Sequence, residues 1–252
     1  MRNFALDFST TNMEVEKNNE TEAQKKPRTM VTLPFLLMAV FFCVFLIVSN
    51  MMEVKLIQIG SITATSGLIV FPLSYILNDC LVEVYGFRRA RLVIWLGFLM
   101  NLVVVLLLQL ALVLPEAEVC DVQDAVQLVW GCTPRILLAS LVAFVCGSML
   151  NAFVMSKMKV RSEGKGFSVR AIASTLVGEG ADSLVFFPIA FGGIYSLPTI
   201  IGLVWTQALM KTLYEVIVLP LTIRVVKAVK RIESLDTYDN GINYSWWKLG
   251  DM

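Results

Sequence analysis

Two carboxylates, Glu179 and Asp182, stand three residues apart in a stretch that is otherwise small or apolar. In a helix this spacing places both side chains on one face. A carboxylate that faces lipid costs about 2.5–3.5 kcal/mol on insertion scales, a cost that a chain accepts when the group faces a polar cavity, a partner or a ligand. The pattern predicts a helix that lines a substrate site.

Polar side chains recur every fourth residue in two other apolar segments. They are Tyr75, Asp79 and Glu83 in one segment, and Gln207, Lys211 and Glu215 in the other. Each set forms one stripe along a helix. Neutral donors and acceptors come from three asparagines: Asn50, Asn101 and Asn151.

The charges within these segments do not balance. Lys211 can pair with Glu215 on its own helix or with an acid of the first helix, and such pairs alone would give the network a structural role. Four acids, Glu83 not counted, nevertheless exceed this one lysine. An acid excess in a membrane cavity binds cations or protons, or accepts hydrogen bonds from a donor-rich ligand. We expect Glu83 to lie at the cytoplasmic interface and to pair with Arg88 or Arg91.

The composition places these residues in a membrane protein. Hydrophobic residues make up 57% of the 252 positions and charged residues only 16%, which indicates an integral membrane protein and excludes an ordinary soluble domain. The chain has no histidine, so a histidine-ligated metal site and an imidazole proton relay are excluded. It also has no CxxC pair that would indicate a zinc or redox site. We expect no metal and no cofactor.

Six apolar runs are long enough to cross a bilayer as helices. They cover residues 31–50, 61–81, 92–114, 136–156, 171–194 and 197–223. The predicted fold is an all-α membrane protein with six transmembrane helices in a domain of residues 30–225. Residues 1–29 are polar, lack the apolar core of a signal peptide and are predicted to form a disordered cytoplasmic tail. Residues 226–252 form a second predicted cytoplasmic tail.

Lysines and arginines gather on one side of these helices. They precede the first, separate the second from the third and the fourth from the fifth, and follow the sixth, whereas the other connections hold only Lys55 and Arg135. Because short loops rich in Lys and Arg stay in the cytoplasm, both termini are predicted to be cytoplasmic. We expect a multi-pass protein of the cell inner membrane, surrounded by lipid.

Short matches relate the first three helices to the last three. They are Trp95 with Trp205, Asn50 with Asn151, and the Phe-Pro pairs at 71–72 and 187–188. Two sets of three helices would run in opposite directions, as in inverted-repeat transporters, whose substrate lies near the membrane midplane. The matches together favour such a 3+3 inverted repeat.

The outer loop at residues 115–134 is acidic and holds Cys120 and Cys132. On an oxidising side of the membrane the two cysteines could close a short loop as a disulfide. The alternative is a pair of free thiols, and the sequence leaves both open.

Four linked motifs extend these patterns. They are Gly67-x-x-x-Phe71-Pro72-x-Ser74-Tyr75-x-x-x-Asp79-x-x-x-Glu83, Arg170-x-x-x-Ser174-Thr175-x-x-Gly178-Glu179-x-x-Asp182-Ser183, Lys211-x-x-Tyr214-Glu215-x-x-x-x-Pro220 and Glu233-x-x-Asp236-x-x-Asp239. Together they resemble the motifs of the queuosine precursor transporters, which belong to the vitamin uptake transporter family. The resemblance covers about residues 31–244. The acidic, cysteine-bearing loop and the long N-terminal tail depart from it and leave the substrate within the class open.

The resemblance implies import of 7-deazapurines for tRNA queuosine modification: 7-cyano-7-deazaguanine, 7-aminomethyl-7-deazaguanine, or queuine and its nucleoside. The guanine-like edge presents two adjacent donors, which Glu179 or Asp182 can bind in a bidentate way. A second carboxylate, Asp79 or Glu215, can meet an aminomethyl cation. The other members of the predicted site are a lysine, amides for ring acceptors and aromatic rings for stacking: Lys211, Asn50, Asn151, Gln207, Tyr75, Phe186 and Phe187.

Two other functions stay open. The chain could be the substrate-binding membrane subunit of an energy-coupling-factor type transporter, which borrows an external ATPase, or an importer of another small planar vitamin-like molecule. It has no Walker A pattern of its own. An enzyme is not supported, since no Gly-x-Gly-Asp, HExxH or nucleophile–base pair occurs. We expect alternating access between two three-helix halves, coupling to a proton through the acids, and no nucleic-acid partner; the oligomeric state is not predicted.

Overall fold

The computed structural model describes residues 31–52, 55–59, 62–117, 122–131 and 134–247. Within them, the residues from Pro34 onward form one compact unit. The predicted tail at 1–29 lies outside the described residues. Cys120 and Cys132 also lie outside them, so the choice between a disulfide and two free thiols stays a prediction.

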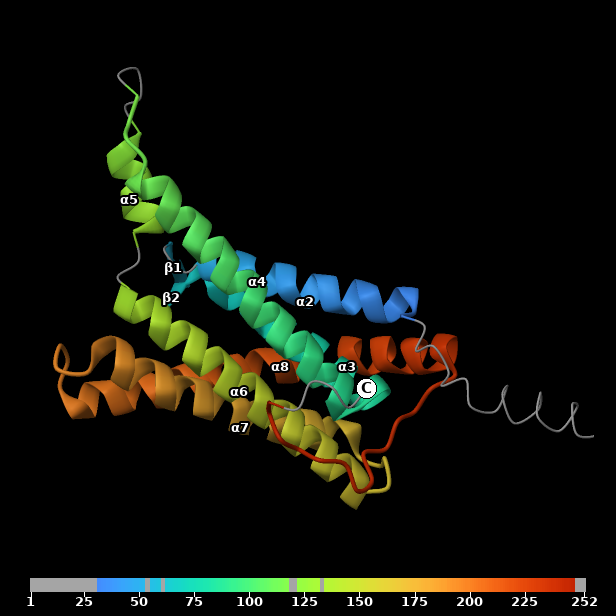
Figure 1. Ribbon diagram of the computed structural model, residues 1–252. Helices are drawn as coiled ribbons and strands as arrows, with labels where there is room; N and C mark the ends of the chain where they lie inside the picture. The colour runs from blue at the N-terminus through green and yellow to red at the C-terminus, as the bar shows by residue number, and fades with distance from the viewer. Residues whose placement is uncertain (1–30, 53–54, 60–61, 118–121, 132–133, 248–252) are drawn as a thin grey trace, which may run out of the picture. The chain divides into compact units, whose positions relative to one another are not determined.

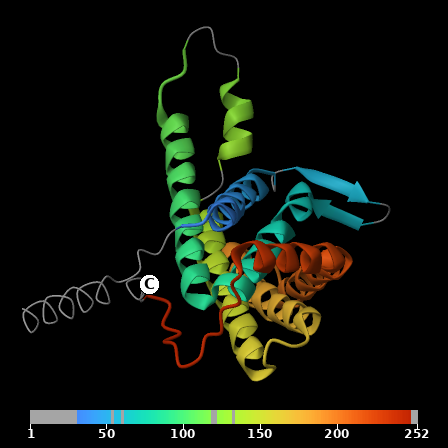
Figure 2. The same ribbon diagram turned by 90° about the vertical axis from the view of Figure 1, so that its right-hand side faces the viewer.

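The described chain is mainly helical (Figure 1). Its helices are α2 (Leu33–Met52), α3 (Phe71–Tyr85), α4 (Phe87–Val113), α5 (Gln123–Trp130), α6 (Pro134–Arg161), α7 (Phe167–Phe191) and α8 (Leu197–Glu233). A two-stranded antiparallel hairpin and a short 3-10 helix connect α2 to α3 (Figure 2): β1 (Leu56–Ile59), β2 (Ile62–Thr65) and η1 (Ser66–Ile69). The predicted helical fold is confirmed, and the hairpin and α5 are elements that the prediction lacks.

Four helices are long and apolar enough to cross a membrane, namely α2, α4, α6 from Leu138 onward, and α7. α3 has 15 residues, about 22 Å of helix, which is shorter than the roughly 30 Å hydrocarbon core of a bilayer. α8 has 37 residues, but Lys211 and Glu215 interrupt its apolar stretch. Six spans therefore remain a prediction where α3 and α8 are concerned.

The second predicted helix, at residues 61–81, begins later than expected. Residues 62–65 form β2, and α3 starts only at Phe71. Three of the four residues of β2 are β-branched, a type that favours extended chain. Pro72 lies in the first turn of α3, where its missing N–H leaves no hydrogen bond unmade. The proline therefore marks the start of the helix.

The connection between α3 and α4 is a single residue. The sequence places Arg88, Arg89 and Arg91 in a loop, whereas the structure places them in the first two turns of α4. Gly86, with φ at +82°, ends α3, and α4 begins at the next residue. A positive φ is easy only for glycine, which makes this abrupt connection feasible. Arg91 is buried as a result, whereas Arg88 stays exposed.

α6 and α7 pack extensively against each other (Figure 1). A Cβ atom at Gly178 of α7 would lie 2.7 Å from the Cβ of Asn151 and 2.9 Å from the carbonyl oxygen of Gly147, both on α6. Only glycine fits at this approach. The close packing lets the Asn151 amide donate a hydrogen bond to the hydroxyl of Thr175 at 3.3 Å. A polar contact is thereby placed in the middle of two apolar helices.

The C-terminal segment, residues 234–247, folds back on the helices. Asp239 accepts hydrogen bonds from the backbone N–H of Phe87 at 2.8 Å and from the hydroxyl of Ser156 at 2.5 Å. These bonds fasten the segment to the start of α4 and to α6. α8 also continues past residue 225 to Glu233, and the cytoplasmic tail at 226–252 stays a prediction.

Candidate functional site

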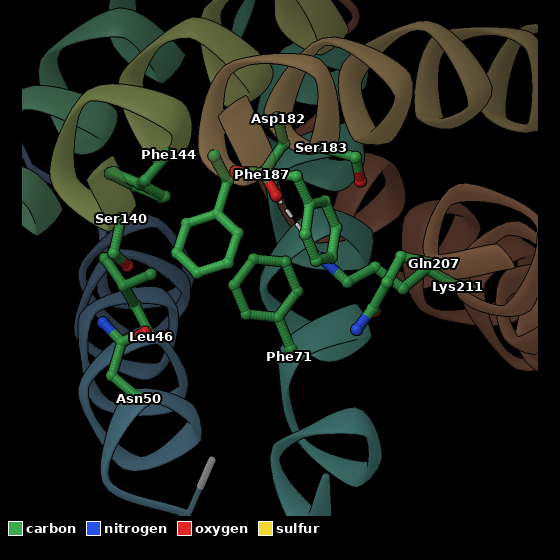
Figure 3. Close-up of a pocket in the computed structure, with 11 residues that line it drawn as sticks. Leu46, Asn50, Phe71, Ser140, Phe144, Asp182, Ser183, Phe187, Gln207 and Lys211 are labelled. Atoms are coloured by element: carbon green, nitrogen blue, oxygen red, sulfur yellow. Dashed lines mark hydrogen bonds and ion pairs between the residues drawn. The ribbon is translucent and has the colours of Figure 1, made fainter. Parts of the chain in front are cut away.

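A pocket opens among five helices, with about 490 Å³ of space when its mouth is included (Figure 3). α2, α3, α6, α7 and α8 each contribute side chains: Leu46, Asn50, Phe71, Ser140, Phe144, Asp182, Ser183, Phe186, Phe187, Gln207 and Lys211. The lining combines rings with amides, hydroxyls, one acid and one lysine, which suits a flat polar molecule.

Six of the eleven predicted site residues line this pocket. They are Asn50, Asp182, Phe186, Phe187, Gln207 and Lys211. The other five stand outside the lining and are at most 2% exposed: Tyr75, Asp79, Asn151, Glu179 and Glu215. All eleven residues face the interior of the bundle, so the helix stripes indicate the correct face. They do not indicate how deep along the helix each side chain lies.

The charge at the pocket is a lysine held between two acids. The ammonium of Lys211 lies 2.8 Å from Oε2 of Glu179 and 3.5 Å from Oδ2 of Asp182. It also lies 3.8 Å from the centre of the Phe71 ring, a cation–π distance. Figure 3 shows the link between Asp182 and Lys211 on the pocket wall. Of the two acids, only Asp182 lines the pocket, whereas Glu179 lies behind the lysine with no exposed surface.

Phenyl rings form much of the remaining wall. Phe186 and Phe187 stand edge to face with their centres 5.3 Å apart. Figure 3 places Phe71, Phe144 and Phe187 around the same space. Of these rings, Phe71 and Phe144 are absent from the predicted site. Phe71 could have been included, because it belongs to the second-helix motif and stands one turn before Tyr75; a phenylalanine such as Phe144 in an apolar helix gives no signal.

Amides complete the pocket. Asn50 donates a hydrogen bond from Nδ2 to Oδ1 of Asn101 at 3.0 Å, which joins α2 to α4. That bond fixes the Asn50 amide and leaves its oxygen side as an acceptor. Gln207 reaches the pocket from α8. The site thus offers both donors and acceptors without further charge.

A buried polar layer lies beyond the pocket. Asp79 and Glu215 are 0% and 1% exposed. The hydroxyl of Ser174 donates to Oδ1 of Asp79 at 3.4 Å, and Nδ2 of Asn78 donates to Oδ1 of Asn151 at 2.9 Å. α3, α6, α7 and α8 all contribute to this layer. It contains two of the carboxylates that the sequence assigns to substrate binding.

A second set of charged side chains lies at the opposite ends of the same helices. The Arg170 guanidinium binds Glu83 through both nitrogens, at 2.5 and 3.1 Å, and Lys230 binds it at 2.6 Å. Lys159 donates to the backbone oxygen of Glu83 and to the carboxylate of Asp236, both at 2.5 Å. We call these five residues the Glu83 cluster. Its members come from α3, α6, α7, α8 and the C-terminal segment.

The predicted partners of Glu83, Arg88 and Arg91, are wrong. The start of α4 at Phe87 turns Arg88 outward, and the guanidinium of Arg91 donates to the carbonyl oxygen of Ser245 at 2.5 Å. The cations of the Glu83 cluster come from helices that are distant in sequence, which loop charges alone do not reveal.

Asp236 is the part of the Glu83 cluster that lies beyond the helices. Partial burial raises the pKa of this carboxyl, but hydrogen bonds from Lys159 and Lys230 outweigh that effect and hold the pKa below its usual value. The carboxylate also lies 2.8 Å from the ammonium of Lys230. The C-terminal segment is therefore bound to α6 and α8 through a fully ionised aspartate at neutral pH.

Within the described residues, no group of three or more His, Cys, Asp or Glu side chains is arranged to hold a metal ion. The charged groups are instead arranged as ion pairs and hydrogen bonds.

Comparison with known proteins identifies a family whose members this chain is similar to. A family model described as "Putative vitamin uptake transporter" matches residues 65–225, a range that includes α3, α4, α6 and α7 entirely and most of α8. A similar protein, "Probable queuosine precursor transporter" of Bacillus subtilis (strain 168), is 28% identical over 186 residues, which is 73% of this chain and 81% of the relative. No solved structure matches the chain.

Proposed function

Since this chain belongs to the vitamin uptake transporter family, we propose that it imports queuosine precursors through the pocket described above. It is a multi-pass membrane transporter and not an enzyme. The proposed substrates are 7-deazaguanine bases such as 7-cyano-7-deazaguanine, 7-aminomethyl-7-deazaguanine or queuine, used for tRNA queuosine modification. The proposed location is the cell inner membrane, with both termini in the cytoplasm.

One observation carries the choice of substrate: an acid and a lysine stand side by side on a wall that faces phenyl rings. A 7-deazaguanine presents N1–H and an amino group next to each other, and the Asp182 carboxylate can accept both. Lys211 and Gln207 can donate to ring acceptors. Phe71 and Phe187 can cover the flat faces of the ring. Of the two acids that the sequence offers for the purine edge, the geometry favours Asp182, because Glu179 is buried behind Lys211.

The proposed movement is alternating access, and the two charged groups mark its two ends. The pocket takes residues from the end of α2, the start of α3 and the second half of α7. The Glu83 cluster takes residues from the end of α3, the start of α7 and the end of α8. If Lys-rich and Arg-rich ends face the cytoplasm, the pocket opens outward and the Glu83 cluster closes the inner side.

The proposal is tested by rescue of tRNA queuosine modification in a host that lacks both queuosine synthesis and its own importer. Each precursor is supplied separately at low concentration. We expect at least one to restore modification through the unaltered chain, and Asp182→Asn to abolish the rescue. Asp124→Asn is the matched control, because it makes the same change at an exposed position on α5. No rescue by any precursor, with the chain confirmed in the membrane, would contradict the proposal.

A further inference from the structure

Two carboxyl groups of the buried layer lie next to the pocket without lining it. Glu215 stands one helical turn from Lys211 on α8, and Asp79 stands two turns from Phe71 on α3. Both carboxyl groups are buried, at 1% and 0% exposure. A ligand in the pocket would therefore contact Lys211 and Asp182, but would not contact this pair directly.

The hydrogen bonds of the pair are incomplete. The Ser174 hydroxyl donates to Oδ1 of Asp79. Among the described residues, no donor reaches Oδ2 of Asp79 or either oxygen of Glu215 in hydrogen-bonding geometry. The polar neighbours of the Glu215 carboxyl are Asp79 itself and the hydroxyl of Thr175. Three of four buried carboxyl oxygens are thus short of a donor, a condition that is costly for an ionised group.

A proton supplies what is missing. Two carboxylates that face each other away from water cannot both stay ionised, whereas one proton between them turns repulsion into a hydrogen bond. The geometry points to Asp79 and Glu215 as a carboxyl pair that binds the proton coupled to import. This inference rests on the proposed function and gives the pair a role separate from substrate contact.

The charges around the pair fit this role. The buried titratable groups on the surrounding helices include Tyr75, Cys80 and Glu83 on α3, Arg91 on α4, Lys159 on α6, Arg170, Glu179 and Asp182 on α7, and Lys211 on α8. Glu83, Lys159 and Arg170 are joined in the Glu83 cluster, and Arg91 is bound to the C-terminal segment. Glu179, held by Lys211, is the acid that adds further negative charge near Glu215.

Lys211 provides a link between substrate and proton. Its ammonium binds the two acids of α7 and stands four residues before Glu215, a spacing at which Lys and Glu side chains can meet on a helix. The four acids Asp79, Glu179, Asp182 and Glu215 outnumber this one ammonium. Hydrogen bonds from a substrate to Asp182 and a proton on the Asp79–Glu215 pair each compensate part of this excess of negative charge. The movement between the two sides is then favoured when both are bound, so substrate and proton cross in the same direction.

The test compares two kinds of transport by the purified full-length chain in liposomes, with labelled 7-cyano-7-deazaguanine as the probe. Exchange of labelled for unlabelled substrate needs no driving force, whereas accumulation needs an imposed inward proton gradient. We expect the unaltered chain to do both. We expect Glu215→Gln and Asp79→Asn to keep exchange within about threefold and to lose accumulation, while Asp124→Asn behaves as the unaltered chain. Elution profiles in detergent report whether each variant is folded.

Several outcomes overturn the inference while leaving import itself intact. They are accumulation by both variants at the unaltered level, accumulation driven by a sodium gradient instead of a proton gradient, and loss of exchange together with accumulation in folded variants. A pH-sensitive dye outside the liposomes needs no variant: the inference requires an alkaline shift when substrate enters. Absence of all transport by the unaltered chain would instead contradict the proposed function.

Discussion

Two groups of charged side chains sit at opposite ends of the same helices, and they differ in how completely they are paired. In the Glu83 cluster, three cations surround two acids, and Arg170 holds Glu83 by two bonds. At the pocket, Lys211 is shared between two acids, at 2.8 and 3.5 Å. In the first arrangement, the cations and the acids bind one another within the cluster. The second has an acid that can accept donors from a ligand, which is what a binding site requires.

From this comparison we expect a substitution in the Glu83 cluster to have the largest effect on stability. Glu83→Gln removes the acid that compensates Arg170 and Lys230 in a buried place, so we expect a loss of about 3–5 kcal/mol in unfolding free energy. The measurement is thermal or denaturant unfolding of the protein in detergent. Glu163→Gln, at an exposed position, is the control and should change little. Equal stability of both variants would show that the ion pairs of the Glu83 cluster do not stabilise the fold.

At the pocket, the same kind of change should affect transport more than stability. Lys211→Gln removes the cation between Glu179 and Asp182. Each charged hydrogen bond contributes about 1.5–3 kcal/mol, so we expect substrate uptake to fall at least tenfold. The unfolding free energy should fall by less than for Glu83→Gln, because an acid at the pocket can take up a proton. Uptake at the unaltered level would remove Lys211 from the site.

The phenyl wall should give a smaller effect. Phe187→Leu keeps an apolar side chain and removes ring stacking, which is worth about 0.5–1.5 kcal/mol. We expect the KM for uptake to rise about three- to tenfold with little change in the maximal rate. Phe41→Leu on α2 is the matched control, because that ring is 48% exposed and faces away from the bundle interior. A change of equal size in both variants would mean that the effect is not due to stacking.

The smallest effect concerns Asp236 and depends on pH. Because Lys159 and Lys230 hold its pKa below the usual value of 3.8, the carboxylate stabilises the fold above that value. This contribution is lost as pH falls through the lower, folded-state pKa. We expect Asp236→Asn to unfold at a lower temperature than the unaltered chain at pH 7, and the two unfolding temperatures to converge as the pH falls below the folded-state pKa of Asp236. A difference that persists or grows in acid would contradict the pairing.

Hydropathy predicts the long apolar helices well. It predicts less well those segments in which β-branched residues or proline determine the secondary structure. Long apolar runs correctly indicate α2, α4, α6 and α7 as helices that can span a membrane. The run at 61–81 is also apolar, but β-branched residues and Pro72 divide it into strand and helix. The motif around Asp236 and Asp239 signalled the C-terminal segment. Its docking could not be predicted, because Lys159, which binds Asp236, and Phe87 and Ser156, which bind Asp239, lie far away in the sequence.

The predicted repeat is supported unevenly by helix positions. Trp95 and Trp205 each lie eight residues after the first residue of their helix, and Asn50 and Asn151 each lie seventeen residues after it. The two Phe-Pro pairs do not correspond, because one opens α3 and the other lies near the end of α7. The inverted repeat stays a prediction that now rests on two matches.

Site depth is the other feature that the sequence could not supply. Glu179 and Asp182 share one helix face, yet Lys211 covers the first and leaves the second on the pocket wall. A three-residue spacing gives no information about which acid a neighbouring helix will cover. For that reason the sequence left Glu179 and Asp182 as alternatives for the same role.

Calorimetric measurement of the binding of 7-cyano-7-deazaguanine to the purified protein tests the central claim. We predict saturable binding to the unaltered chain, binding at least tenfold weaker to Asp182→Asn, and unchanged binding to Asp124→Asn. A chain that does not bind this base or its 7-aminomethyl and queuine analogues, or one in which Asp182→Asn binds as tightly as the unaltered chain, would contradict the assignment of the pocket.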